Sequence, residues 1–366
     1  MQIAKRMQSI DSSGIRKIFD LASKLKNPIN LSIGQPDFDV PDLIKNEAIL
    51  AIQNGYNRYT PTGGTPELKE RLLTRLEKDK QRHFEDIIVT SGVSGALFLS
   101  FLSLIDPGDE VLIPDPYFVS YKHLVNFLGG KPVFIDTYPD FKLPKEKLEN
   151  AITEKTKILI LNSPSNPTGK VYSRNELIDI VDVAKKHNLL IISDEIYEQF
   201  VFNDEYTSIS SLYNNVLLLS GYSKSFGIPG WRVGYAAGAK EIIKEMTVIQ
   251  QYTFVCAPSF AQKAILESID YDLTDEINNY KRKRDIVYNG LKSEFNIQLS
   301  GGAFYLFPKV PNGSDQEFVE RAIANNVLVI PGSVFSERNT HFRISFANTD
   351  EQLKKGIDIL NSISKA

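Results

Sequence analysis

The feature that most constrains the fold is a series of short apolar runs through the middle of the chain, rich in valine, isoleucine and leucine. The runs are DIIVTS, DEVLIP, TKILILN, NLLIISDE, NVLLLSG and RVGYAAG. Several of the connections between them are long enough to hold a crossover helix. Apolar runs joined in this way are typical of a buried, largely parallel sheet, so we expect an α/β domain.

Two of the connections carry clear helix signals. Ser173-Arg174-Asn175-Glu176 matches a capping box, and the periodic apolar residues that follow it predict a helix from about residue 174. GALFLSFLSLI, which begins at Gly95, is the longest apolar run and ends at an Asp-Pro-Gly turn. This run is shorter than the ~18 residues that a membrane span needs, so it predicts a buried helix.

The pattern changes after about residue 265. A long charged helical segment, YDLTDEINNYKRKRDIVYNGLKSEF, is followed by short strands and by two helix starts, Ser314-x-x-Glu317 and Thr349-x-x-Gln352. The first forty residues include a helical stretch, SSGIRKIFDLASKL, but lack a core of their own, so they should pack on a domain or on a partner chain. We predict three parts: an N-terminal arm with part of the small domain (1–40), a large α/β domain (41–265) and a small α+β domain (266–366).

Charge and cysteine content limit which classes of function the chain can have. The formal net charge of −3 gives no bias toward nucleic acid, and the single cysteine, Cys256, excludes an internal disulfide framework. The N-terminus MQIAKRMQSI has no apolar core of signal-peptide length, so a cytoplasmic location is expected, without membrane attachment. The four histidines show no metal-ligand spacing, and no metal site is expected.

Polar residues directly follow the apolar runs, at the edge where open α/β sheets bind ligands. They are Ser91–Gly95, Asn162–Gly169, Asp194–Tyr197 and Gly221–Lys224, with Arg232 just before the last run. They offer a helix N-terminus and an arginine for a phosphate, a carboxylate for a cation, hydrogen-bonding groups and an amine. A lysine in a largely apolar turn is costly to keep charged, and Lys224 is therefore a candidate neutral amine. This set predicts a site for pyridoxal 5′-phosphate, whose aldehyde, ring nitrogen and phosphate need these groups.

The chain resembles the class I and II aminotransferases, which have the aspartate aminotransferase fold, type I of the pyridoxal-phosphate enzymes. The motifs that carry the resemblance occur in that family's order: LSIGQPDFDVP, YTPTGGTPELKE, VTSGVSGAL, DPYFVSY, NSPSNPTG, SDEIY, SKSFGIPGWRVGY, GAFY and FRISFA. The resemblance implies a large domain with a mostly parallel seven-stranded sheet between helices, and a smaller α+β domain.

The resemblance also assigns roles around the cofactor ring. It implies that Lys224 forms the Schiff base and later moves a proton at the substrate carbon. Asp194 would pair with the pyridinium nitrogen and hold the ring cationic, so that the ring withdraws electrons from the reacting carbon. Asn166 and Tyr197 would bond the 3-oxygen, and Phe118 would stack on the ring face.

The phosphate contacts follow in the same way. The resemblance implies Arg232, the backbone amides of Val93 and Ser94, the Ser94 hydroxyl and Ser223. Tyr59 would reach the phosphate bound by a partner subunit, which implies a homodimer with shared active sites.

One position departs from the family pattern. Many relatives have a hydroxyl three residues before the lysine, where this chain has Gly221. The contact assigned to Ser223 is therefore less secure than that of Arg232, and Ser220 is the alternative.

The resemblance implies transfer of the amino group of an L-amino acid to a 2-oxo acid, with 2-oxoglutarate as acceptor, in a ping-pong mechanism through pyridoxamine phosphate. Arg343 would grip the substrate carboxylate, helped by the Gly34 backbone and by Asn166. A carbon–sulfur lyase on the same scaffold stays open, because its reaction would begin with the same bond to the cofactor. A ligand-sensing regulator is disfavoured, because such chains carry a DNA-binding domain ahead of this fold.

The donor amino acid is not fixed by these motifs. In some relatives a cation near the segment VIQQYTFVCAPSF binds a second substrate carboxylate, but residues 247–262 contain no lysine or arginine here. This mildly disfavours recognition of dicarboxylates by a fixed charge, although Tyr252, Thr253 or Arg16 are alternatives.

Overall fold

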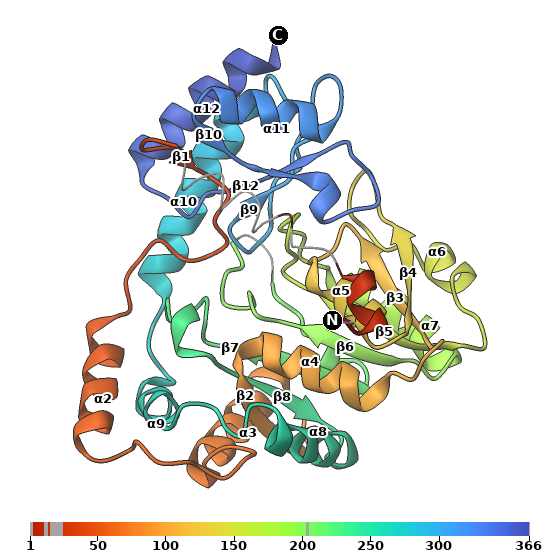
Figure 1. The fold of residues 1–366 in the computed structure, drawn as a ribbon, viewed down its shortest axis with the longest axis vertical. Helices are drawn as coiled ribbons and strands as arrows, with labels where there is room; N and C mark the ends of the chain where they lie inside the picture. The colour runs from red at the N-terminus through yellow and green to blue at the C-terminus, as the bar shows by residue number, and fades with distance from the viewer. Residues whose placement is uncertain (1–2, 11–13, 15–24, 203–204, 366) are drawn as a thin grey trace.

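The computed structural model describes the chain except for residues 1–2, 11–13, 15–24, 203–204 and 366 (Figure 1). The helix expected at SSGIRKIFDLASKL lies almost entirely outside the described residues, as does Arg16. Of the helices in the described part, none is both long and apolar enough to cross a bilayer.

A seven-stranded sheet forms the centre of the larger part of the molecule, in the order β2-β8-β7-β6-β5-β3-β4. Its strands are β2 (Asp86–Ser91), β3 (Glu110–Asp115), β4 (Lys131–Asp136), β5 (Thr156–Asn162), β6 (Leu190–Asp194), β7 (Val216–Gly221) and β8 (Val233–Gly238). Only β8 runs antiparallel to its neighbours, β2 and β7, while every other pair is parallel. The predicted mostly parallel sheet is therefore confirmed.

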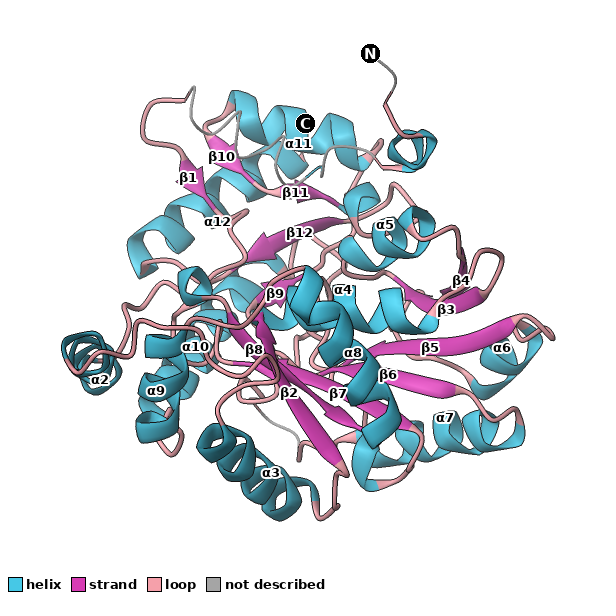
Figure 2. Ribbon diagram, turned by 60° about the horizontal axis from the view of Figure 1, so that its bottom comes forward, coloured by secondary structure: helices cyan, strands magenta, loops and turns pink. Residues whose placement is uncertain are grey.

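Helices cover both faces of this sheet (Figure 2). They are α3 (Pro66–Lys80), α4 (Gly92–Leu104), α5 (Ser120–Phe127), α6 (Lys145–Asn150), α7 (Arg174–Lys186), α8 (Lys240–Tyr252) and α9 (Ser259–Ser268), while α2 (Asp42–Gln53) packs against α9. Alternate residues of a strand face opposite sides, so Ile88 packs with α4 and α8 while Ile87 and Val89 pack with α3 and α9. Helix α4 is the buried helix expected from GALFLSFLSLI, with most of its residues inaccessible to solvent.

The smaller part contains two further sheets and three helices. Strands β9 (Tyr305–Leu306), β11 (Ile330–Pro331) and β12 (Phe342–Ser345) form an antiparallel sheet in the order β11-β12-β9. Strand β1 (Ile29–Asn30) pairs in parallel with β10 (Val327–Leu328), so the N-terminal segment joins this part. The helices are α10 (Thr274–Leu291), α11 (Asp315–Ala324) and α12 (Asp350–Ser364). Short 3₁₀ turns occur at η1 (Lys5–Ser9), η2 (Ile209–Ser211), η3 (Pro229–Trp231) and η4 (Gly332–Val334). The domain boundaries at residues 40 and 265 stay a prediction.

The predicted helix starts are present. Ser173 accepts a hydrogen bond from the Glu176 amide and the Glu176 carboxylate accepts one from the Ser173 amide, so α7 begins with a complete capping box. Helix α11 begins with the same motif at Ser314. Thr349 caps α12 through the Gln352 amide.

Candidate active site

A cavity of about 330 Å³ lies beyond the carboxyl ends of β5, β6 and β7, where the large sheet meets β9 and β12. All of the predicted site residues except Tyr59 line it. They are Gly34, Val93, Ser94, Phe118, Asn166, Asp194, Tyr197, Ser223, Lys224, Arg232 and Arg343. The structure therefore brings together residues that are more than 300 positions apart in the chain, although their individual roles stay predictions.

Lys224 follows β7 and extends into the cavity. Its Nζ donates a hydrogen bond of 2.6 Å to the Gly34 carbonyl oxygen, and no ion pair to a carboxylate occurs within the described residues. Burial, together with the guanidinium groups of Arg343 and Arg232, lowers the pKa of Lys224 to about 8. An appreciable fraction of this amine is therefore neutral near neutral pH and available as a nucleophile.

Asp194 ends β6 and, among the residues that the structure describes, is the only acidic one that lines the cavity. Its Oδ2 accepts a hydrogen bond of 2.7 Å from the Tyr121 hydroxyl, and its Oδ1 accepts one of 3.2 Å from the Ile196 amide. Burial raises the pKa of Asp194 to about 6, although these two hydrogen bonds act in the opposite direction. The carboxylate is therefore held in one orientation, and a cation bound beside it would favour its ionised form.

The loop after β5 holds Asn166 between this carboxylate and Arg343. The backbone N–H of Asn166 donates a hydrogen bond of 2.8 Å to the side-chain oxygen of Asn162. The side-chain NH₂ group of Asn162 donates one, also of 2.8 Å, to the backbone carbonyl oxygen of Asp194. The Oδ1 of Asn166 accepts a hydrogen bond of 3.0 Å from Arg343. Because the Asn166 oxygen is occupied in this way, its side-chain NH₂ group is the part that remains to donate to a ligand.

Arg343 is almost completely buried, with 1% of its surface exposed. Its guanidinium carbon lies 4.5 Å from the ring centroid of Tyr305 and 4.6 Å from that of Phe335, and the guanidinium also donates to the Ser32 carbonyl oxygen at 2.7 Å. Its Nε has no hydrogen-bond partner, and no carboxylate pairs with it among the described residues. A buried guanidinium with an unpartnered N–H is suited to a carboxylate ligand.

Arg232 lies at the N-terminus of α4. Its two terminal nitrogens donate to the carbonyl oxygens of Pro229 and Ser91, at 3.0 and 3.1 Å. Gly92 opens α4 at φ +67°, and a Cβ built on it would lie 2.6 Å from the Arg232 guanidinium, so glycine is required for this close approach. No side chain caps the first turn of α4, so its amides remain available to an anion.

Ser223 lines the cavity whereas Ser220, its alternative, does not. Ser220 belongs to β7, and its hydroxyl donates to Glu198 on the other side of the sheet at 3.0 Å. Of the two serines, only Ser223 is within reach of a ligand in the cavity.

Tyr59 does not line the cavity of its own chain. It lies in the loop between α2 and α3, and 85% of its surface is exposed.

Among the other residues that line the cavity, Asn162, Tyr121 and Tyr305 were given no role from the sequence. All three lie in motifs that carried the resemblance, NSPSNPTG, DPYFVSY and GAFY. The motifs marked the segments, but a sequence does not say which hydroxyl or amide of a segment faces inward.

Comparisons with known proteins agree with this geometry. The family model described as aminotransferase class I and II matches residues 26–360. The chain is 40% identical to a probable aspartate aminotransferase of Methanocaldococcus jannaschii, with 99% of each chain covered. It is 34% identical to aromatic-amino-acid aminotransferase 2 of Thermococcus litoralis, and the match covers 100% of this chain and 99% of that protein. Among solved structures, the aspartate aminotransferase from Thermus thermophilus with maleate matches with a TM-score of 0.96 at 32% identity, covering 99% of this chain and 100% of that one.

Proposed function

Since the chain belongs to the class I and II aminotransferase family and is an aminotransferase, we propose that it moves the amino group of an L-amino acid to a 2-oxo acid with pyridoxal 5′-phosphate as cofactor. The reaction would be ping-pong, with pyridoxamine phosphate between its two halves and 2-oxoglutarate as the acceptor. The observation that carries the proposal is the meeting of Lys224, Asp194 and two arginines without carboxylate partners in one cavity.

The residues present fit this cofactor. Within the described part of the chain, the cavity is lined by three cationic side chains, Lys224, Arg232 and Arg343, and by one acidic one. Such an excess of positive charge suits a ligand set that carries a phosphate and a carboxylate. Arg232, Ser94, Ser223 and the uncapped amides of α4 would hold the phosphate.

Asp194 would hold the ring nitrogen in its protonated form. Its orientation is fixed by Tyr121 and by the Ile196 amide. The ring would restore the charge of this carboxylate, because a neighbouring cation lowers the pKa that burial raises. Phe118, which also lines the cavity, is available to stack on the ring.

When bound, pyridoxal phosphate supplies an aldehyde that takes up amino groups and a cationic ring that withdraws electrons from the reacting carbon. Lys224, whose pKa is lowered, would be the amine that holds the aldehyde and the base that moves a proton at the substrate α-carbon. Tyr197 and Asn166 would donate to the 3-oxygen. The Nε edge of Arg343 would bind the α-carboxylate that every donor and acceptor shares.

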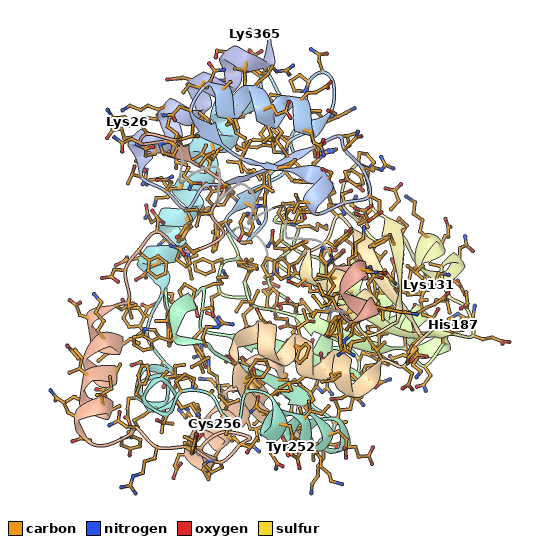
Figure 3. All side chains as sticks on the ribbon, viewed as in Figure 1. Lys26, Lys131, His187, Tyr252, Cys256 and Lys365 are labelled. Carbon is orange, nitrogen blue, oxygen red and sulfur yellow. The ribbon has the colours of Figure 1, made fainter. Side chains whose placement is uncertain are left out.

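A homodimer with shared sites is the form we propose for the active protein. Apolar side chains that are 47–51% exposed line α2, and the neighbouring Tyr59 is 85% exposed. Tyr252 at the end of α8 is 84% exposed and lies, with Cys256, at the lower edge of the molecule (Figure 3). The exposed apolar side chains of α2 are Leu43, Ile49, Leu50 and Ile52. Exposed apolar side chains of this kind fit an interface between copies. Cys256 is a free thiol, which fits the reducing cytoplasm as the proposed location.

The proposal is tested by single half-reactions. The protein loaded with pyridoxal phosphate is mixed with one amino acid at a time, and loss of its visible absorbance is followed together with release of the 2-oxo acid. We expect stoichiometric 2-oxo acid and pyridoxamine phosphate with at least one donor, and return of the absorbance on addition of 2-oxoglutarate. Release of ammonia with a continuously retained visible band would instead indicate a lyase and contradict the proposal.

A further inference from the structure

Tyr305, the tyrosine of GAFY, has no role in the function described so far. It lies in β9, which pairs with the strand that carries Arg343, and 1% of its surface is exposed. Its hydroxyl lies 2.9 Å from the Tyr197 hydroxyl, and its ring centroid lies 4.5 Å from the guanidinium carbon of Arg343. One side chain thus contacts both the phenol proposed for the cofactor ring and the arginine proposed for the substrate carboxylate.

The hydroxyl groups of Tyr197 and Tyr305 carry two protons between them. Burial raises the pKa of both Tyr197 and Tyr305, so both stay protonated over the physiological pH range. The bond between them uses one of the two protons, and either oxygen can donate it. Neither hydroxyl has another hydrogen-bond partner within the described part of the chain. If Tyr197 donates to a group in the cavity, the bond between the two phenols must therefore be donated by Tyr305.

We propose that Tyr305 is a positioning residue with two roles. Its hydroxyl directs the Tyr197 proton into the cavity, and its ring, which contacts the Arg343 guanidinium, keeps that group in one orientation. The inference rests on the proposed function, because the acceptor in the cavity is the 3-oxygen of the cofactor.

Each half of this role has a physical consequence. A hydroxyl that accepts a hydrogen bond donates its own proton more strongly, so Tyr305 strengthens the bond from Tyr197 to a negatively charged oxygen. The rings of Tyr305 and Phe335 both contact the Arg343 guanidinium, which restricts the rotation of the guanidinium and favours its charged form in a buried place.

Four variants separate these contributions. Tyr305→Phe removes the hydroxyl and keeps the ring, whereas Tyr305→Leu removes both. Tyr197→Phe is the reference for complete loss of the donor. Tyr280→Phe is the matched control, because Tyr280 is equally buried in the same aromatic cluster but bonds Asp37 and does not line the cavity.

Two readouts are made on the protein loaded with pyridoxal phosphate. The first is the midpoint of the pH titration of its visible absorbance, which depends on how well negative charge on the 3-oxygen is stabilised. The second is the dissociation constant of maleate, an unreactive carboxylate, measured from its perturbation of the same absorbance.

We expect Tyr305→Phe to raise the titration midpoint by a few tenths of a pH unit, in the direction of the larger rise in Tyr197→Phe, because weaker donation leaves more charge on the oxygen. Maleate affinity should be nearly unchanged in Tyr305→Phe and fall by about threefold or more in Tyr305→Leu. Tyr280→Phe should match the wild type in both readouts.

A wild-type midpoint in Tyr305→Phe would overturn the role of the hydroxyl, and equal maleate affinity in Tyr305→Phe and a folded Tyr305→Leu would overturn that of the ring. The Phe variant alone keeps the inference falsifiable if the Leu variant does not fold. If the wild-type protein gains no visible band with pyridoxal phosphate, the proposed function is wrong, and this inference, which rests on it, is wrong as well.

Discussion

At the scale of single residues, the cavity shifts the pKa values of its central lysine and carboxylate toward each other. Burial raises the pKa of Asp194 to about 6 and, with the neighbouring arginines, lowers that of Lys224 to about 8. Perturbed groups of this kind are common at catalytic sites, because a nucleophile or base must exist in its reactive form at working pH.

The lowered pKa of Lys224 gives a pH-dependent prediction. A lysine reacts with an acylating reagent only as the neutral amine, so in the cofactor-free protein the rate of acetylation of Lys224 should reach half of its plateau near pH 8. Pulse labelling with acetic anhydride between pH 6 and pH 11, followed by peptide mass spectrometry, measures this, with exposed Lys26 as the internal reference. Half-plateau of Lys224 near pH 10.5, the ordinary value for lysine, would contradict a lowered pKa for this amine.

Arg343 gives a second prediction at this scale. A lysine offers a point charge where the guanidinium offers a planar fork, so Arg343→Lys should weaken all amino-acid substrates by a similar factor. The expected cost is on the order of 1.5–3 kcal/mol for each lost charged hydrogen bond, while affinity for pyridoxal phosphate barely changes. Half-reaction constants for alanine, aspartate and an aromatic amino acid measure it. An effect confined to aspartate would make Arg343 a residue for the side-chain carboxylate instead.

Much of the residue-level site was predictable, because each strand-end motif brings several polar groups to one edge of the sheet. The motifs did not determine which way each side chain points. Ser220 and Ser223 were alternatives for one contact, and the alternation of side chains along β7 sends Ser220 to the face that carries Glu198. Tyr121 and Tyr305 were missed because an aromatic residue in an apolar segment is usually part of the core.

At the scale of elements, the helix starts and six of the strands in the large sheet follow from local signals, whereas the edge strand β4 does not. Six of the strands in the large sheet correspond to the apolar runs, but β4 was not among them. It is one of the two edge strands, its side chains are mostly half-buried, and its sequence KPVFID includes a proline, so it lacks the continuous apolar pattern of a strand buried on both faces.

The capping box of α7 predicts a measurable stability effect. In Ser173→Ala the Glu176 amide loses its acceptor, and the free energy of unfolding should fall by about 0.5–2 kcal/mol. Ser173→Asp retains a capping oxygen and should lie close to the wild type. Urea unfolding of the three proteins measures the difference. If the alanine variant were as stable as the aspartate variant, the cap would contribute nothing.

At the scale of the whole molecule, the site depends on segments that meet only in the folded chain. Gly34 comes from the N-terminal segment, Lys224 and Asp194 from the large sheet, and Arg343 from β12. The pairing of β1 with β10 explains how the N-terminal segment reaches this place, and no local pattern in the sequence predicts that pairing. The family resemblance supplied this level of organisation, because it covers nearly the whole chain.

The proposed dimer predicts complementation between two defective subunits. Lys224→Ala lacks the amine, and Tyr59→Phe lacks the hydroxyl that is offered to the partner's site. A mixed dimer would place both defects in one site and leave the other site intact. Transaminase activity of subunits that are unfolded together and refolded should therefore exceed that of either parent. A fully active monomer, identified by sedimentation, would contradict this arrangement.

The most direct test of the account is the identity of the lysine that holds the cofactor. The protein loaded with pyridoxal phosphate is reduced with borohydride, digested and mapped by mass spectrometry, with Lys224→Ala treated in parallel as the control. The account predicts one peptide that carries the reduced cofactor, with the modification on Lys224, and no such peptide from the variant. A cofactor-bearing peptide that contains any other lysine, or equal labelling of the variant, would contradict it.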